Sequence, residues 1–154
     1  MLHKIESTQH IKSDMSTVWD FISSPKNLAV ITPAYMNFTV INEVKPIDKM
    51  YAGQIIEYHV SPVLGVKLKW VTEISHVEDH YYFVDEQRFG PYTFWHHKHF
   101  IRKVDDGVEM VDIVHYKLPF GFIGRLVNTL FVKKQLKEIF NYRHKKIDEL
   151  FNAK

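Results

Sequence analysis

The stretch MVDIVHYKLPFGFIG, residues 110–124, contains the change of hydrophobic period that decides the fold. Before Pro119 apolar and polar residues alternate, as they do on a half-buried β-strand. After Gly121 apolar residues recur every three or four positions, which is typical of an amphipathic helix. The stretch therefore predicts a strand followed directly by a C-terminal helix, and Gly121 and Gly124 would let that helix begin close to the sheet.

The alternating pattern extends upstream of this stretch, over residues 35–118. Turn residues such as Gly90-Pro91 and Asp106-Gly107 divide it into about six strands with short connections. A further strand is expected from Leu2 to Ile11. The sequence thus predicts an antiparallel sheet of about seven strands.

Two short helices are expected after the first strand. Ser13-Asp14 offers an N-cap for the first helix, and the second runs from Asn27 to Ile31 before Thr32-Pro33 ends it.

The C-terminal helix is predicted to be long, at about 30 residues, with one apolar stripe. The residues of this stripe are Ile123, Val127, Leu130, Phe131, Leu136, Ile139, Phe140, Ile147, Leu150 and Phe151. Lysines and Arg143 lie mostly off it. A membrane-seeking helix is one interpretation, but the apolar face of the sheet needs a cover, so we expect the helix to pack there. The result is an α+β helix-grip fold, which commonly leaves a cavity between sheet and helix.

The composition fits one soluble globular domain, residues 1–154. A net charge of +2 is too small to indicate a nucleic-acid partner, and the absence of cysteine excludes disulfides and thiolate chemistry. The N-terminus lacks the apolar run of a signal peptide, and no run of about 18 apolar residues predicts a membrane span. We therefore expect a cytoplasmic protein.

Three groups of residues resemble the SRPBCC (START-like) superfamily of helix-grip ligand-binding proteins, and the resemblance covers nearly the whole chain. They are Val18-Trp19-Asp20-Phe21…Pro25…Asn27-Leu28…Ile31-Thr32-Pro33, then Phe83-x-Asp85-Glu86-Gln87-x-x-Gly90-Pro91-Tyr92-x-x-Trp95-x-His97-x-His99, and finally Met110-x-Asp112-x-Val114-x-Tyr116-x-x-Pro119-Phe120-Gly121-x-x-Gly124.

Within that superfamily the chain is most similar to a bacterial subfamily often labelled "cell division inhibitor" or SRPBCC family protein. Nothing in these residues indicates a role in cell division. The resemblance implies the helix-grip fold but no reaction, because the superfamily includes lipid carriers, hormone receptors, polyketide cyclases and oxygenase domains.

Polar side chains are expected on the concave face of the sheet. With Asp106-Gly107 as a type I′ turn, His97 would lie opposite Tyr116, and His99 diagonal to Asp112. These four residues and Trp95 share the interior face, while His96 and Lys98 face outward. Buried polar groups must bond to one another, to water or to a ligand.

The neighbouring strand, residues 81–87, contributes to the same face. A turn at Phe89-Gly90-Pro91 would pair Asp85 with Trp95 and Phe83 with His97, and would turn Asp85 and Gln87 inward. A shift of one residue would turn Glu86 inward instead.

Three interpretations of this face compete. His97 and His99 with Asp85 or Asp112 could bind a metal, but H-x-H is common on strands and the third ligand depends on an assumed register. A His99–Asp112 pair beside Tyr116 could move protons. A recognition network that orients a mostly apolar guest is the interpretation we favour, with no metal and no cofactor.

The sequence therefore predicts a binder of a small hydrophobic or amphipathic molecule. The expected ligand-binding residues are Trp70, Phe83, Asp85, Gln87, Trp95, His97, His99, Asp112, Tyr116, Leu130 and Phe131. The alternative is an enzyme of the polyketide cyclase or dehydratase type that uses His99 and Asp112 as its acid–base pair. A third possibility is an interaction module whose cavity is filled by side chains.

Overall fold

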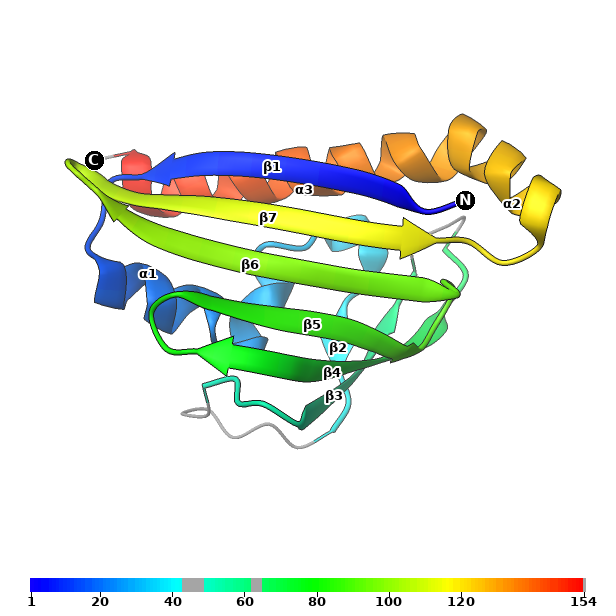
Figure 1. Ribbon diagram of the computed structural model, residues 1–154, viewed down its shortest axis with the longest axis horizontal. Helices are drawn as coiled ribbons and strands as arrows, with labels where there is room; N and C mark the ends of the chain where they lie inside the picture. The colour runs from blue at the N-terminus through cyan, green and yellow to red at the C-terminus, as the bar shows by residue number, and fades with distance from the viewer. Residues whose placement is uncertain (43–48, 62–64, 154) are drawn as a thin grey trace.

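A seven-stranded antiparallel sheet and a long C-terminal helix form the framework of the protein (Figure 1). The computed structural model describes residues 1–42, 49–61 and 65–153. The strands lie in the order β1-β7-β6-β5-β4-β3-β2. Their bounds are β1 His3–Ile11, β2 Thr39–Val40, β3 Gln54–Val60, β4 Leu68–Glu78, β5 Tyr82–Phe89, β6 Phe94–Val104 and β7 Gly107–Lys117.

Short helices follow β1, and one long helix follows β7. The first group is α1 (Met15–Ile22), η1 (Pro25–Ala29) and η2 (Ala34–Met36). The long helix consists of α2 (Gly121–Val127), the π-helical segment η3 (Asn128–Val132), α3 (Lys133–Ile147) and a second π-helical segment, η4 (Asp148–Asn152). These elements confirm the predicted helix-grip architecture.

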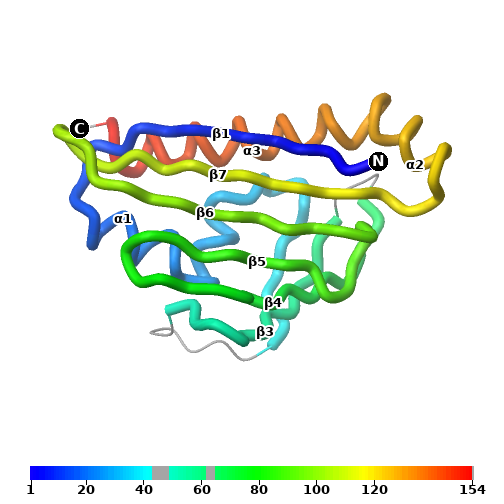
Figure 2. Tube along the Cα trace, in the orientation of Figure 1, coloured from blue at the N-terminus to red at the C-terminus, as the bar shows by residue number. Residues whose placement is uncertain are grey.

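The long helix packs against the face of the sheet that carries the apolar residues of β7, as the alternating sequence predicted. Met110, Asp112, Val114 and Tyr116 are buried in strict alternation along β7. Val132 and Leu136 of the helix join Val114 and Tyr116 in one hydrophobic cluster. The helix runs beside β1, with the N-terminus near α2 (Figure 2).

The β6–β7 register differs from the prediction by two residues. Val104 pairs with Gly107, so Asp105-Asp106 forms the turn, and His99 lies directly opposite Asp112 instead of diagonal to it. The reason lies in β1, because a Cβ on Gly107 would stand 2.2 Å from the backbone oxygen of Ile11. Gly107 is therefore suited to a close approach between strands rather than to the turn.

The β5–β6 register also differs by two residues. Asp85 pairs with His97 and Phe83 with His99, because the loop runs from residue 90 to residue 93. Side chains alternate along a strand, so an error of two leaves every residue on its predicted face. The predicted inward orientation of Asp85 is therefore confirmed.

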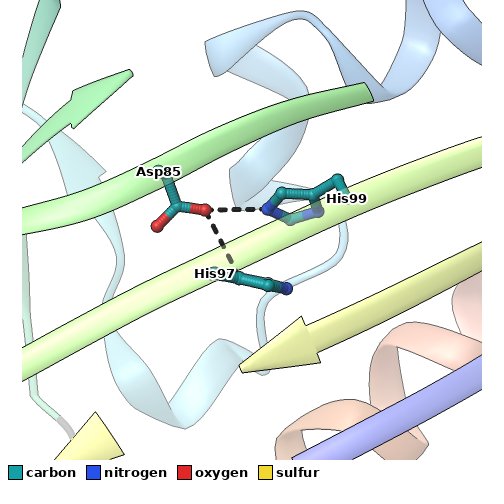
Figure 3. A group of neighbouring side chains, drawn as sticks. All are labelled: Asp85, His97 and His99. Atoms are coloured by element: carbon teal, nitrogen blue, oxygen red, sulfur yellow. Dashed lines mark hydrogen bonds and ion pairs between the residues drawn. The ribbon is translucent and has the colours of Figure 1, made fainter. Parts of the chain in front are cut away.

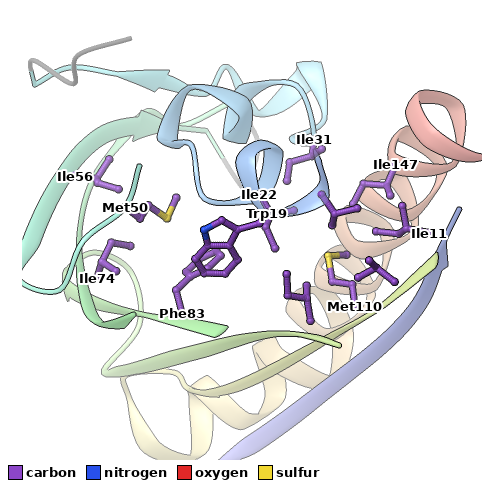
Figure 4. Packing of buried hydrophobic residues seen from close by; sticks show 13 residues of the cluster. Ile11, Trp19, Ile22, Ile31, Met50, Ile56, Ile74, Phe83, Met110 and Ile147 are labelled. Carbon is purple, nitrogen blue, oxygen red and sulfur yellow. The ribbon is translucent and has the colours of Figure 1, made fainter. Parts of the chain in front are cut away.

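Helix α1 covers one part of the concave face. Asp14 caps it as predicted, accepting hydrogen bonds from the backbone N–H of Thr17 at 2.9 Å and its hydroxyl at 2.6 Å. Trp19 is 1% exposed and contacts Phe83 edge-on, at the centre of the largest hydrophobic cluster (Figure 4).

The first half of the long helix presents a different face from the one we predicted. Gly124, Asn128, Val132 and Leu136 are its buried positions. Their spacing of four residues exceeds the 3.6 residues of an α-helical turn, and the π-helical segment η3 accommodates it. The predicted stripe residues Leu130 and Phe131 consequently point to solvent, 56% and 63% exposed, as do Ile123 and Val127.

Of the two glycines at the start of this helix, Gly124 allows a close approach, to the residues that link β7 to the helix, whereas an added Cβ at Gly121 would meet nothing within 4 Å. Gly121 has φ +49°, and a Cβ on Gly124 would stand 2.0 Å from the backbone oxygen of Pro119. Within the described part of the chain, no helix combines the length and the apolar composition needed to cross a membrane.

Candidate functional site

A cavity of about 170 Å³ lies between the sheet, the short helices and the long helix. Its lining is mostly aromatic and aliphatic, with a few polar side chains. The lining residues include Leu28, Ile31, Met36, Phe38, Met50, Ile56, Tyr58, Val60, Trp70, Phe83, Tyr92, Trp95, Leu136, Ile139 and Phe140, and the polar members Thr32, Thr72, Asp85, His97, His99, Gln135 and Arg143.

Asp85, His97 and His99 form a polar cluster on the cavity wall (Figure 3). Asp85 comes from β5, and the two histidines come from the paired strand β6. The Oδ2 atom of Asp85 lies 2.7 Å from His99 Nε2 and 3.3 Å from His97 Nδ1. The second oxygen of Asp85 accepts a hydrogen bond from Trp95 Nε1 at 3.2 Å, which fixes the carboxylate.

Asp112 supports the histidines from the β7 side. Its Oδ1 atom lies 2.8 Å from His99 Nδ1 and 3.0 Å from His97 Nε2. Arg143 reaches the same oxygen from the long helix, at 3.3 Å. Asp112 is 2% exposed, so three donors share one buried carboxylate oxygen.

His99 is positioned to carry a proton on both ring nitrogens. Each nitrogen faces a carboxylate oxygen at hydrogen-bond distance, and a neutral imidazole can donate from only one. Burial opposes the charge, but the hydrogen bonds to Asp112 and Asp85 outweigh it and raise the pKa of His99. Arg143 Nη2 lies 3.3 Å from His99 Nδ1; a hydrogen bond there needs a lone pair on Nδ1, so Arg143 competes with Asp112 for this nitrogen.

The pKa of His97 moves in the opposite direction. Burial is the largest cause, and the neighbouring His99 adds to it, so the pKa of His97 is lowered. A neutral His97 can donate from Nε2 to Asp112. The two imidazole rings are tilted by 37° with their centroids 3.7 Å apart, and this proximity disfavours a charge on both.

Both carboxyl groups stay ionised. Burial acts to raise the pKa of Asp112, but Arg143, His97 and His99 hold it well below its usual value. Burial also acts to raise the pKa of Asp85, but His97 and His99 outweigh it, so this pKa is lowered as well. With a proton on both nitrogens of His99, the two carboxylates would be balanced by that imidazolium and by the Arg143 guanidinium.

The cluster also contains the atoms of a possible metal site. One ligand atom each from Asp85, His97 and His99 lies within 4.8 Å of the other two. Asp112 would orient both imidazoles from behind, an arrangement common around metal-binding histidines. A metal bound there would have to replace the proton between His99 and Asp85.

Two buried donors of the lining have no acceptor among the described residues. They are Trp70 Nε1 and Arg143 Nε, and both side chains are 8% exposed. A buried donor without a partner costs about 1–3 kcal/mol. These atoms are suited to acceptors on a bound guest.

Six of the predicted site residues line the cavity. They are Trp70, Phe83, Asp85, Trp95, His97 and His99. Five do not. Asp112 and Tyr116 lie behind the lining, and the side-chain amide of Gln87 bonds to the backbone of Tyr92 at 2.6 and 3.2 Å. Leu130 and Phe131 are exposed for the reason given above, which corrects their predicted place in the wall.

The structure adds Arg143 and Tyr92 to the predicted set. Arg143 was expected on the polar face of the helix but is buried. Asn128 accepts a hydrogen bond from the Tyr116 hydroxyl at 2.9 Å. The sequence does contain a signal for Arg143, because it occupies the position between Leu136 and Ile147 that the apolar spacing reserves for a buried residue.

Comparisons with known proteins establish the fold. No protein-family model and no curated protein matches the chain. Among solved structures, protein CV1439 from Chromobacterium violaceum is similar with a TM-score of 0.73 and 10% identity, over 98% of this chain and 99% of that one.

The ginseng major latex-like protein 151 from Panax ginseng is similar with a TM-score of 0.69 and 11% identity, over 97% of each chain. For protein Ms6760 from Mycobacterium smegmatis the values are 0.67 and 16%, over 96% of this chain and 89% of that one. Identities this low show a shared fold and leave the function to be argued from the site.

Proposed function

We propose that this protein binds a small, mainly apolar molecule in the cavity between its sheet and its long helix. The observation that carries the proposal is the lining itself, an aromatic and aliphatic wall with a buried polar cluster at one place. Concave sites of this composition are the usual binding sites for small molecules. Membership of the SRPBCC superfamily is part of the proposal, and the sequence motifs and the shared fold support it.

The size of the cavity limits the guest. At about 170 Å³ it is close to the engineered cavity of about 150 Å³ that takes up benzene. Drug-sized ligands use pockets of roughly 300–1,000 Å³. We infer a guest built on one substituted ring or an equivalent short chain.

The polar lining limits the chemistry of the guest. Trp70 Nε1 and Arg143 Nε offer donors, and the carboxylate of Asp85 lies in the same wall. A carbonyl, ether or hydroxyl oxygen suits these donors. A carboxylate would add an unbalanced charge to a buried site, which is costly.

Acid–base catalysis in the same cavity is the alternative, and the buried histidine–carboxylate network favours it. The His99–Asp112 pair exists, at 2.8 Å, but Asp112 is not part of the wall. His99 is part of the wall, so it would have to exchange protons with a substrate. This alternative requires that His99→Asn abolish conversion of a bound guest without abolishing its binding.

Native mass spectrometry of freshly purified protein tests the proposal. A guest retained from the cell would add a discrete mass, removed by unfolding and identifiable in an organic extract. Its mass should correspond to a molecule of about one ring. A guest that persists when Ile139 of the lining is replaced by Trp would contradict the proposed location.

A further inference from the structure

The outer face of α2 and η3 carries large apolar side chains that are exposed rather than packed in a core. We call it the apolar helical face. It consists of Phe120, Phe122, Ile123, Leu126, Val127, Leu130 and Phe131, which are 41–79% exposed. Contiguous apolar surface of this extent is uncommon on soluble monomers and marks an interaction site.

The fold explains why this face is exposed. The four-residue spacing places Gly124, Asn128 and Val132 on the sheet-facing side of this segment. The larger apolar side chains therefore lie on the side away from β7. In Figure 1, α2 lies at one end of the molecule, beyond the end of β1.

The charges around this face have one sign. Residues 113–137 contain no Asp and no Glu. Arg125 lies over the Phe122 ring, 5.6 Å from its centroid, and Lys133 and Lys137 follow as exposed residues on the next turns. Exposed Lys134 lies 4.0 Å from Glu138. An apolar face with a basic border is the pattern of helices that lie in a membrane surface.

Self-association through this face is less favourable. A two-fold dimer places the same patch of both subunits together. The basic residues that border the apolar helical face would then meet their own copies, and like charges in contact oppose association. Anionic lipid headgroups would instead complement them.

We propose that the apolar helical face docks on anionic membrane surfaces. Phe122, Leu126 and Phe131 would enter the boundary between headgroups and acyl chains, and Arg125, Lys133 and Lys137 would contact the headgroups. The proposal is independent of the guest in the cavity, because it rests on the outer side of the helix. It concerns a peripheral contact without a span.

Vesicle co-sedimentation of the full chain tests the proposal. With phosphatidylcholine vesicles containing about one-third phosphatidylserine, we expect the protein to sediment, and much less so with phosphatidylcholine alone. The triple variant Phe122→Ser, Leu126→Ser, Phe131→Ser should lose at least tenfold in binding. In a double variant, Lys133→Glu with Lys137→Glu, binding to the phosphatidylserine vesicles should fall by about tenfold or more, so that the preference for anionic lipid is lost.

A matched triple variant controls for general loss of apolar surface. Tyr51→Ser, Tyr81→Ser and Phe89→Ser replace side chains that are 59%, 62% and 72% exposed, against 72%, 51% and 63% at the three positions in the face. This control should bind like the wild type. Equal losses in both triple variants would overturn the proposal. So would the absence of vesicle binding by the wild type. A concentration-dependent dimer that only the first triple variant abolishes would also overturn it.

Discussion

Asp112 is the residue on which the polar cluster depends. Its buried carboxylate accepts a hydrogen bond from His97 and lies within ion-pair distance of His99 and Arg143, at 2.8–3.3 Å. Removing one partner of a buried ionic network leaves the others unpaired, which costs far more than the loss of one contact. Asp112 therefore acts as a structural anchor for groups that themselves face the cavity.

We expect Asp112→Asn to lower the free energy of unfolding by about 3–5 kcal/mol, measured by urea denaturation. The charge of Arg143 and the second proton of His99 would lose their counterion in a buried place. Asp20→Asn is the control, because Asp20 is exposed and, among the described residues, pairs only with Lys49; the urea midpoint of this variant should hardly move. Equal effects at the two positions would show that the cluster is not an ionic network.

The same residues predict a loss of stability in acid. Folding lowers the pKa of both Asp85 and Asp112. Their stabilisation is therefore complete above the unfolded pKa of about 3.9 and is lost as pH falls through the folded values. We expect the free energy of unfolding to decline between about pH 5 and pH 2, less steeply in Asp112→Asn than in the wild type. Parallel pH profiles would contradict this assignment.

The sequence predicted the four members of the polar cluster that lie on strands, but not Arg143, which joins them from the long helix. His97, His99, Asp85 and Asp112 could be placed on one face because strand alternation tolerates the register errors of two residues. Arg143 could not be placed from its charge, since a lone arginine on a long helix normally faces water. Its position within the apolar spacing was the better indicator.

At the level of elements, the helix phase was the least predictable feature. The α-helical period placed Leu130 and Phe131 against the sheet, whereas the structure exposes them. A π-helical segment is not encoded by a recognisable motif, so a pattern of apolar residues cannot reveal it. The strands and the Asp14 cap could be predicted because both depend on local patterns.

Gly124 offers a test of the contact between the long helix and the preceding loop. Alanine usually stabilises a helix relative to glycine, by about 0.5–1 kcal/mol. Here a Cβ would stand 2.0 Å from a backbone oxygen, so we expect Gly124→Ala to destabilise the protein by about 1–3 kcal/mol. Thermal unfolding measures the effect, and a stabilised variant would show that the helix does not approach the loop so closely.

At the scale of the whole molecule, one helix has two faces with different roles. Its inner face closes the cavity through Leu136, Ile139, Phe140 and Arg143. Its outer face bears the apolar residues of the proposed docking surface. The sequence predicted the helix-grip arrangement because the change of period at Pro119 is abrupt, but the cavity volume depends on packing and had to come from the structure.

The most direct test of the proposed function is an NMR titration with acetophenone, which combines one ring with one acceptor oxygen. We expect saturable binding with a Kd of about 1 mM or below, with the largest shifts at lining residues and at the Trp70 indole N–H. Ile139→Trp, which fills the cavity, should abolish binding, whereas Ile123→Trp on the exposed side of the same helix should preserve it. Absence of saturable binding, or equal binding by both variants, would contradict the cavity as the binding site.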